Sequence, residues 1–231
     1  MFPTVRARVT YCAHLFKALT RQHHRALLPL LAPHIPQDGI VLDVGAHAGQ
    51  LTKLFSGMTP AGHVYAFEPG GYARSILKTV RRVRRLKNVT VLPCGLSDEN
   101  TQAVLNIPVK NSGSLGFGLG SLGAPAGERR IHAETVALRR LDDVVAEYAL
   151  PRVDFIKADI EGWELHMLRG AQQTLCRYKP VLLLELNDSA LRRAGSDRAG
   201  VVSFLQALGY VPVAHGDDAF FIPAPPAAAG A

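Results

Sequence analysis

Long apolar runs are absent from this chain of 231 residues. No stretch reaches the ~18 consecutive apolar residues that a membrane-spanning helix needs. We expect no secretory signal, because basic and histidine side chains interrupt the N-terminal segment: Arg6, Arg8, His14 and Lys17. Hydrophobic residues make up 48% of the chain and charged residues 19%, a balance typical of a globular domain. We therefore expect a cytoplasmic protein with no transmembrane segment.

Cysteine is scarce, and acidic residues are fewer than basic ones. Cys12, Cys94 and Cys176 are far apart and form no C-x-x-C pair, so we expect buried or incidental thiols in a reducing compartment. The net charge is +7, and its densest concentration lies late in a predicted helix: Lys78, Arg81, Arg82, Arg84, Arg85 and Lys87. This cluster is typical of a solvated helix face; the alternative is a contact for RNA, acidic lipid or acidic glycan. Aromatic residues are missing between Arg81 and Lys87, which disfavours base stacking there.

Short apolar runs alternate with helical patterns from residue 40 onward. Strands are predicted at 40–44, 63–67, 89–93, 153–158 and 180–185. Helices are predicted at 48–56, 70–86, 163–178 and 197–208. A hairpin pattern over 210–222 closes the series. This alternation predicts an α/β fold with a mostly parallel sheet that is doubly wound, with helices on both faces.

The chain divides into an N-terminal extension, one main domain and a short tail. Residues 1–36 carry apolar positions at helical spacing and predict an amphipathic helical extension packed on the domain, with a homo-oligomer contact or a membrane-surface helix as alternatives. Residues 37–223 form the predicted domain, and residues 224–231 a disordered Pro/Ala-rich tail. Two alternating segments, 102–107 and 132–138, flank a glycine-rich stretch at 111–127 that we expect to close over a substrate.

Two predicted strands end in acids around a glycine turn. Asp43 precedes the turn from Gly45 to Gly49, and Glu68 ends the next strand. This order is typical of a nucleoside-binding half-fold, in which the second acid accepts the ribose hydroxyls. The glycine spacing departs from G-x-G-x-x-G, and Asp43 would repel a pyrophosphate, which disfavours NAD. An acid here favours a cationic ligand such as S-adenosylmethionine.

A second group of acids follows the later strands. Asp159 and Glu161 close the fourth predicted strand, and Glu185 closes the fifth, so all three should meet at the same sheet edge. They can hold an ammonium group, deprotonate a hydroxyl, or bind a divalent cation through Asp159 and Glu185. Asp159 is the first candidate base and Glu161 the second, with helix capping an equal alternative for Glu161. The further candidate bases are two histidines, of which the second is more typical of helix packing: His47 and His166.

These motifs resemble the FkbM family of S-adenosylmethionine-dependent methyltransferases. The matching runs are D-V-G-A-x-x-G-Q (Asp43–Gln50), F-E-P (Phe67–Pro69), I-K-x-D-I-E-G-x-E-x-x-x-L-R-G-A (Ile156–Ala171) and P-x-L-L-L-E-L (Pro180–Leu186). The similarity extends from about residue 40 to residue 187, and the third run is the most specific to the family. His47 and Ala48 depart from the family pattern at the methionine end of the donor.

The resemblance implies a seven-stranded class I methyltransferase fold and O-methylation of a small molecule, sugar or glycan. It places Ser97 and Asp98 near the adenine, and Asp159 and Glu161 at the reaction centre. The remaining donor contacts that it implies are Asp43, Gly45, Ala46, Gly49, Glu68, Pro69 and Asp159.

Two other functions stay open. The basic surface allows an RNA methyltransferase, although the Asn-Pro-Pro-aromatic signature of amino-group methylation is replaced here by Asp159-Ile160-Glu161-Gly162, so a nucleic-acid partner is disfavoured. A non-catalytic nucleoside-binding module is the second alternative, and the presence of both Asp159 and Glu161 argues against it.

Overall fold

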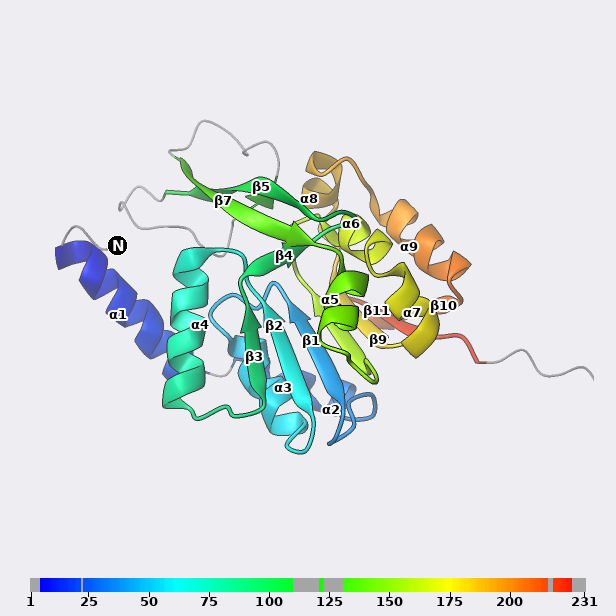
Figure 1. Ribbon diagram of the computed structural model, residues 1–231, viewed down its shortest axis with the longest axis horizontal. Helices are drawn as coiled ribbons and strands as arrows, with labels where there is room; N and C mark the ends of the chain where they lie inside the picture. Colours follow the sequence, from blue (N-terminus) through cyan, green and yellow to red (C-terminus); the bar gives the residue numbers. More distant parts are fainter. Residues whose placement is uncertain (1–4, 22, 110–120, 123–130, 216–217, 226–231) are drawn as a thin grey trace, which may run out of the picture.

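A seven-stranded sheet forms the centre of the molecule (Figure 1). The computed structural model describes residues 5–21, 23–109, 121–122, 131–215 and 218–225. The strand order is β10-β11-β9-β8-β1-β2-β3, and only β11 runs against its neighbours. The strands are β1 (Ile40–Val44), β2 (His63–Phe67), β3 (Val89–Leu92), β8 (Phe155–Ala158), β9 (Val181–Glu185), β10 (Tyr210–His215) and β11 (Asp218–Pro223). The predicted mostly parallel sheet with a closing hairpin is therefore confirmed.

Helices cover both faces of this sheet, because successive residues of the central strands point to opposite sides. Val41 packs in one apolar cluster, whereas Leu42 and Val44 pack in another. The first face carries α2 (Leu28–Leu31), α3 (Gln50–Met58) and α4 (Gly71–Val83). The second carries α5 (Leu141–Glu147), α6 (Glu164–Arg169), α7 (Gln172–Tyr178) and α9 (Arg198–Ala207). The predicted doubly wound arrangement is confirmed.

The N-terminal extension packs on the domain, as expected. It contains α1 (Val5–Thr20) and a 3-10 turn, η1 (His23–Leu27), before α2. Ala18 of α1 is buried against Ile76 and Val80 of α4, and the rings of Tyr11 and Tyr72 meet edge to face at 5.7 Å. Within the described ranges, no helix combines the length and apolar character needed to cross a bilayer.

A second, four-stranded sheet stands above the carboxyl ends of β1 and β2 (Figure 1). Its strands are β4 (Cys94–Leu96), β5 (Thr101–Pro108), β6 (Ser121–Leu122) and β7 (Ile131–Arg139). The two alternating segments predicted at 102–107 and 132–138 pair antiparallel as β5 and β7. The predicted substrate-covering stretch 111–127 lies outside the described residues except for β6, as does most of the predicted disordered tail.

The single helix predicted over 163–178 is wrong: α6 and α7 are separate helices. Gly170 lies between them, and a Cβ at this position would collide with the backbone oxygen of Ser97. The backbone N–H of Asp142 donates to the Gly170 oxygen at 3.0 Å. The Asp142 carboxylate accepts the backbone N–H groups of Gln173 and Thr174, at 3.1 and 2.8 Å, and so caps α7. Contacts with distant segments therefore divide the helix.

Two further differences concern short elements. The strand predicted at 89–93 ends at Leu92, because the chain turns there and residues 94–96 join the second sheet as β4. Helices α5 and α8 (Asp188–Arg193) were not predicted, since each has only six or seven residues and shows little periodicity. The side chain of Asn187 accepts the N–H groups of Ser189 and Ala190 and starts α8.

Candidate functional site

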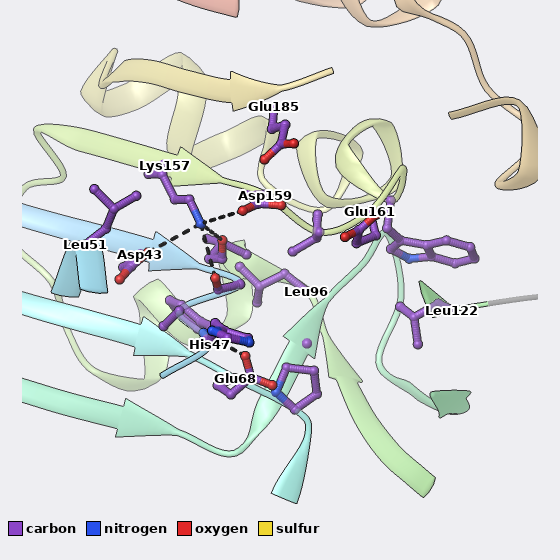
Figure 2. Close-up of a pocket in the computed structure, with 18 of the residues that line it drawn as sticks. Asp43, His47, Leu51, Glu68, Leu96, Leu122, Lys157, Asp159, Glu161 and Glu185 are labelled. Carbon is purple, nitrogen blue, oxygen red and sulfur yellow. Dashed lines mark hydrogen bonds and ion pairs between the residues drawn. The ribbon is translucent and has the colours of Figure 1, made fainter. Parts of the chain in front are cut away.

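A cavity of about 500 Å³ opens at the carboxyl ends of β1, β2 and β8 (Figure 2). Acids from four strand ends line it, as the sequence pattern predicted: Asp43, Glu68, Asp159, Glu161 and Glu185. Gly45, Ala46 and Pro69, which the resemblance implied as donor contacts, line it too. The position agrees with the rule that ligands bind beyond the carboxyl ends of parallel strands.

The turn after β1 requires its glycines. Gly45 has φ +75°, and a Cβ there would collide with the backbone oxygen of Asp159. This close approach joins the tip of β1 to the tip of β8. Gly49 has φ +85° and precedes α3, but it packs against Leu77 and does not line the cavity. Gly49 therefore shapes the turn without forming part of the cavity wall.

Glu68 presents a buried carboxylate at the edge of the cavity. Its side chain accepts two backbone N–H groups at 2.8 Å, from His47 to Oε2 and from Gly70 to Oε1. Burial raises the pKa of Glu68 to about 7, although these two bonds act in the opposite direction. The bonds hold the carboxylate in one orientation at the end of β2.

Lys157 was not assigned a role from the sequence, yet it lies at the base of the cavity (Figure 2). Its ammonium nitrogen is 3.8 Å from Oδ1 of Asp43 and 3.6 Å from Oδ2 of Asp159, and it donates to the backbone oxygen of Gly45 at 3.1 Å. Asp43 is fully buried and also accepts the hydroxyl of Thr52 at 2.5 Å. Burial raises the pKa of Asp43, and Lys157 and Thr52 oppose that shift.

This pairing corrects the electrostatic argument for a cationic ligand. The sequence argument assigned that preference to Asp43, whose charge the structure pairs with Lys157. The negative charge that remains at the cavity comes from side chains that reach solvent. Asp159 has 40% of its side chain exposed, Glu161 is half-buried and Glu185 is exposed. Lys157 is also 3.6 Å from Asp159, but one cation offsets only one of these acids, so negative charge still predominates at the tip of β8.

A buried acid fixes the turn that carries Asp159 and Glu161. Oε1 of Glu164 accepts the backbone N–H groups of Ile160 and Gly162, at 3.0 and 3.4 Å. Glu164 is fully buried, and burial raises its pKa to about 7. Glu164 therefore accepts the amides of this turn. This is the helix-capping role that the sequence pattern left open for Glu161.

The side chain of Glu161 lines the cavity. Its backbone has φ +55°, and the following Gly162 has φ +100° at a place where a Cβ would collide with the backbone of Ala190. Burial and the neighbouring Asp159 raise the pKa of Glu161, while Arg193 acts against that shift. The turn therefore directs its acidic side chain toward the cavity rather than into the helix end.

Ser97 and Asp98 lie behind the cavity wall rather than in it. The Ser97 hydroxyl bonds Asp98 at 2.9 Å and accepts the indole N–H of Trp163 at 3.1 Å. His166 stacks on Trp163, with Nδ1 3.1 Å from Asp98 and Nε2 3.2 Å from the Ala194 oxygen. Although burial opposes it, bonding from His166 and Ser97 lowers the pKa of Asp98. His166 thus has a packing role, and Ser97 positions Trp163, which does line the cavity.

Several lining residues had no recognisable sequence signal. His24 comes from η1, and Gln50 and Leu51 begin α3. Leu105 and Leu122 come from the second sheet and form an apolar wall with Leu96 and Trp163. Among the described residues, no group of three or more His, Cys, Asp or Glu is placed to share a metal ion. Asp159 and Glu185 therefore belong to no such ligand set within the described chain.

Comparisons with known proteins agree with this geometry. A model of the methyltransferase FkbM domain matches residues 43–212. The chain is 27% identical over 186 residues to the AMB antimetabolite synthetase AmbE of Pseudomonas aeruginosa, covering 67% of this chain and 9% of AmbE. It is 24% identical over 176 residues to the 2-O-methyltransferase NoeI of Sinorhizobium fredii, covering 73% of this chain and 70% of NoeI.

A solved structure shares the fold. Methyltransferase FkbM from Methylobacillus flagellatus aligns with a TM-score of 0.57 at 17% identity, covering 94% of this chain and 59% of that one. The chain thus spans less than two thirds of the length of both AmbE and the Methylobacillus protein.

Proposed function

Because the chain belongs to the FkbM methyltransferase family, we propose that it transfers a methyl group from S-adenosylmethionine to a hydroxyl of a small molecule, sugar or glycan. One observation carries the proposal: the buried Glu68 carboxylate and the acids Asp159 and Glu161 line the same cavity. The relative NoeI, named a 2-O-methyltransferase, supports a hydroxyl acceptor.

The cavity has the size and chemistry for the donor. A volume of about 500 Å³ is typical of a pocket for a molecule of this size. Glu68 would accept the ribose hydroxyls, and the apolar wall of Leu96, Leu105, Leu122 and Trp163 would contact the adenine. Gly45 allows the backbone to approach the methionine part closely. When bound, S-adenosylmethionine supplies the methyl group on an activated sulfonium.

The acids at the tip of β8 would serve the acceptor. Asp159 would accept the proton of the acceptor hydroxyl, because its side chain lines the cavity and is 40% exposed. Lys157, 3.6 Å away, orients this carboxylate. Glu161 adds a second negative charge beside the reaction centre, and Leu105 and Leu122 from the second sheet exclude water.

Asp159→Asn tests the assignment. We expect turnover on a panel of sugars and hydroxylated small molecules to fall by about 100-fold or more. Binding of S-adenosylhomocysteine, measured by calorimetry, should stay within about threefold of the original protein, since the amide keeps the size of the side chain. Asp188→Asn is a matched control, because Asp188 pairs with Arg198 on the surface, 3.2 Å apart and away from the cavity.

The two readouts separate two failures. Turnover near the original level in Asp159→Asn would remove Asp159 from the mechanism. Absence of measurable affinity for both S-adenosylmethionine and S-adenosylhomocysteine in the unaltered protein would overturn the donor assignment itself.

A further inference from the structure

Two stretches of this chain carry basic residues without any acid. No Asp or Glu precedes Asp38, and none lies between Glu68 and Asp98. These two stretches hold 12 of the 26 Lys and Arg residues, whereas the remaining 165 residues hold 14 Lys and Arg against all 19 acids. The charge of the molecule is therefore strongly asymmetric rather than evenly spread.

The tertiary structure brings the two basic stretches together. Helix α1 from the first packs on α4 from the second, at the outer edge of the molecule (Figure 1). The guanidinium of Arg84, just beyond α4, donates to the Leu19 oxygen of α1 at 2.5 Å. Lys53 donates to the backbone oxygens of Ala18 and Arg21. The C-terminal ends of α1 and α4 are therefore fastened side by side.

Large apolar side chains are exposed among these cations. On α1, Val9 is 63% exposed and Phe16 is 68% exposed, two helical turns apart. They lie on the side of α1 opposite Tyr11, Leu15 and Ala18, which pack toward α4. Val83, the last residue of α4, is 58% exposed. We call the surface at these helix ends the basic helix-end face: Phe16, Lys17, Arg21, Val83, Arg84 and Arg85.

We propose that the basic helix-end face docks on a lipid bilayer containing anionic headgroups. Lys17, Arg21, Arg84 and Arg85 would face the headgroups, each contributing electrostatic attraction. Phe16 and Val83 would enter the boundary between headgroups and acyl chains, as exposed apolar residues of basic interfacial helices do. Because the two stretches contain no acid, no neighbouring carboxylate within them competes for these cations.

The same observations argue against two other occupants. A second copy of this chain would bring two basic surfaces together, and like charges repel. Single-stranded RNA is held by interleaved stacking aromatics, whereas Phe16 is the single aromatic residue of the basic helix-end face and its other apolar residue is Val83. A bilayer matches both the charge and the aliphatic character of the surface.

Vesicle flotation tests the proposal with the full chain. The probe is vesicles of phosphatidylcholine mixed with phosphatidylglycerol, compared with vesicles of phosphatidylcholine alone. We expect binding only to the anionic vesicles, and weaker binding as salt rises. Lys17→Glu with Arg85→Glu should weaken binding about tenfold or more. Phe16→Ala should weaken it several-fold at unchanged net charge.

The matched control is Arg169→Glu with Arg192→Glu, which changes the net charge equally at exposed positions of α6 and α8. It should weaken vesicle binding by less than about threefold. All of these positions are exposed, and circular dichroism will verify folding. Calorimetry with S-adenosylhomocysteine should be unchanged in every variant, so failure of this proposal is distinguishable from failure of the proposed function.

Four results would overturn the proposal. The first is equal binding to neutral and anionic vesicles, or no binding to either. The second is an equal loss in both charge-reversed variants, which would indicate net charge alone. The third is binding of a mixed-sequence RNA that displaces the vesicles and is insensitive to Phe16→Ala. The fourth is a dimer in light scattering that Phe16→Ala dissociates, without vesicle binding.

Discussion

Lys157 and Asp43 are direct neighbours on adjacent parallel strands, with the ammonium nitrogen 3.8 Å from Oδ1 of the carboxylate. Both side chains are inside the sheet: Asp43 is fully buried, and only 6% of Lys157 is exposed. A buried charge without a partner is costly, so each residue makes the other tolerable. This pair joins β1 to β8 at the floor of the cavity. The carboxylate of Asp159 lies beside it, 3.6 Å from the same ammonium nitrogen.

Replacing Lys157 by Met should destabilise the protein strongly. Asp43 would keep its burial but lose its cationic partner, which typically costs about 3–5 kcal/mol. Urea unfolding measures the change in free energy. The double variant Asp43→Asn/Lys157→Met should be more stable than Lys157→Met, because it removes the unpaired charge. A double variant no more stable than the single one would show that the two residues do not depend on each other.

Donor affinity should rise with pH because of Glu68. Burial raises the pKa of this carboxyl to about 7 in the free protein, and the charged form is the better acceptor for ribose hydroxyls. Affinity for S-adenosylhomocysteine should therefore increase about tenfold between pH ~6 and pH ~8, as measured by calorimetry. Glu68→Gln should bind more weakly and with little pH dependence. An unchanged pH profile in this variant would assign the titration to another group.

Glu164 should make the protein less stable as pH rises. Its pKa is raised from 4.5 to about 7 by burial, so the folded state holds a proton more tightly than the unfolded state. Below pH ~4.5 this protonation stabilises the folded state by about 3 kcal/mol. The stabilisation is lost progressively as the pH rises from ~4.5 to ~7. Urea unfolding at pH ~5 and pH ~8 should show a smaller decrease in Glu164→Gln than in the unaltered protein.

The matched control for this comparison is Glu99→Gln, because Glu99 is exposed. That variant should keep the pH dependence of the unaltered protein. Equal slopes in all three proteins would contradict the role given to Glu164.

Gly45 and Gly57 should respond oppositely to replacement by Ala. Gly45→Ala adds a Cβ at φ +75° that collides with the Asp159 backbone, so it should cost about 2–4 kcal/mol and abolish donor binding. Gly57 lies within α3 with open space around its missing Cβ. Gly57→Ala should therefore stabilise the protein by about 0.5–1 kcal/mol. Thermal unfolding compares them, and similar stabilities would contradict the close contact between β1 and β8.

The strands and the strand-end acids could be predicted because their signals are local. Each central strand is a short apolar run; Asp43 lies near the end of β1, and Glu68 and Asp159 follow β2 and β8 directly. The hairpin that closes the sheet could also be predicted, because its pattern is local in the sequence. The break at Gly170 could not be predicted, because the residues in contact there, Ser97 and Asp142, are far away in the sequence.

The candidate site divides in the same way. The sequence could name the acids, but the partners of these acids depend on strand order. In the sequence, Lys157 is only a charged residue that interrupts an apolar strand. Its partner Asp43 becomes apparent once β8 is placed beside β1. His24 lines the cavity because η1 contacts α3, and no motif marks it.

The sequence by itself determined the alternation of strands and helices, the glycine turn and the acids that close the strands, since these depend on residues close in the chain. Only the tertiary structure decided which charges are neutralised, which helices are divided and which surface collects the excess cations. Those outcomes depend on contacts between distant segments, whose energies no local pattern contains.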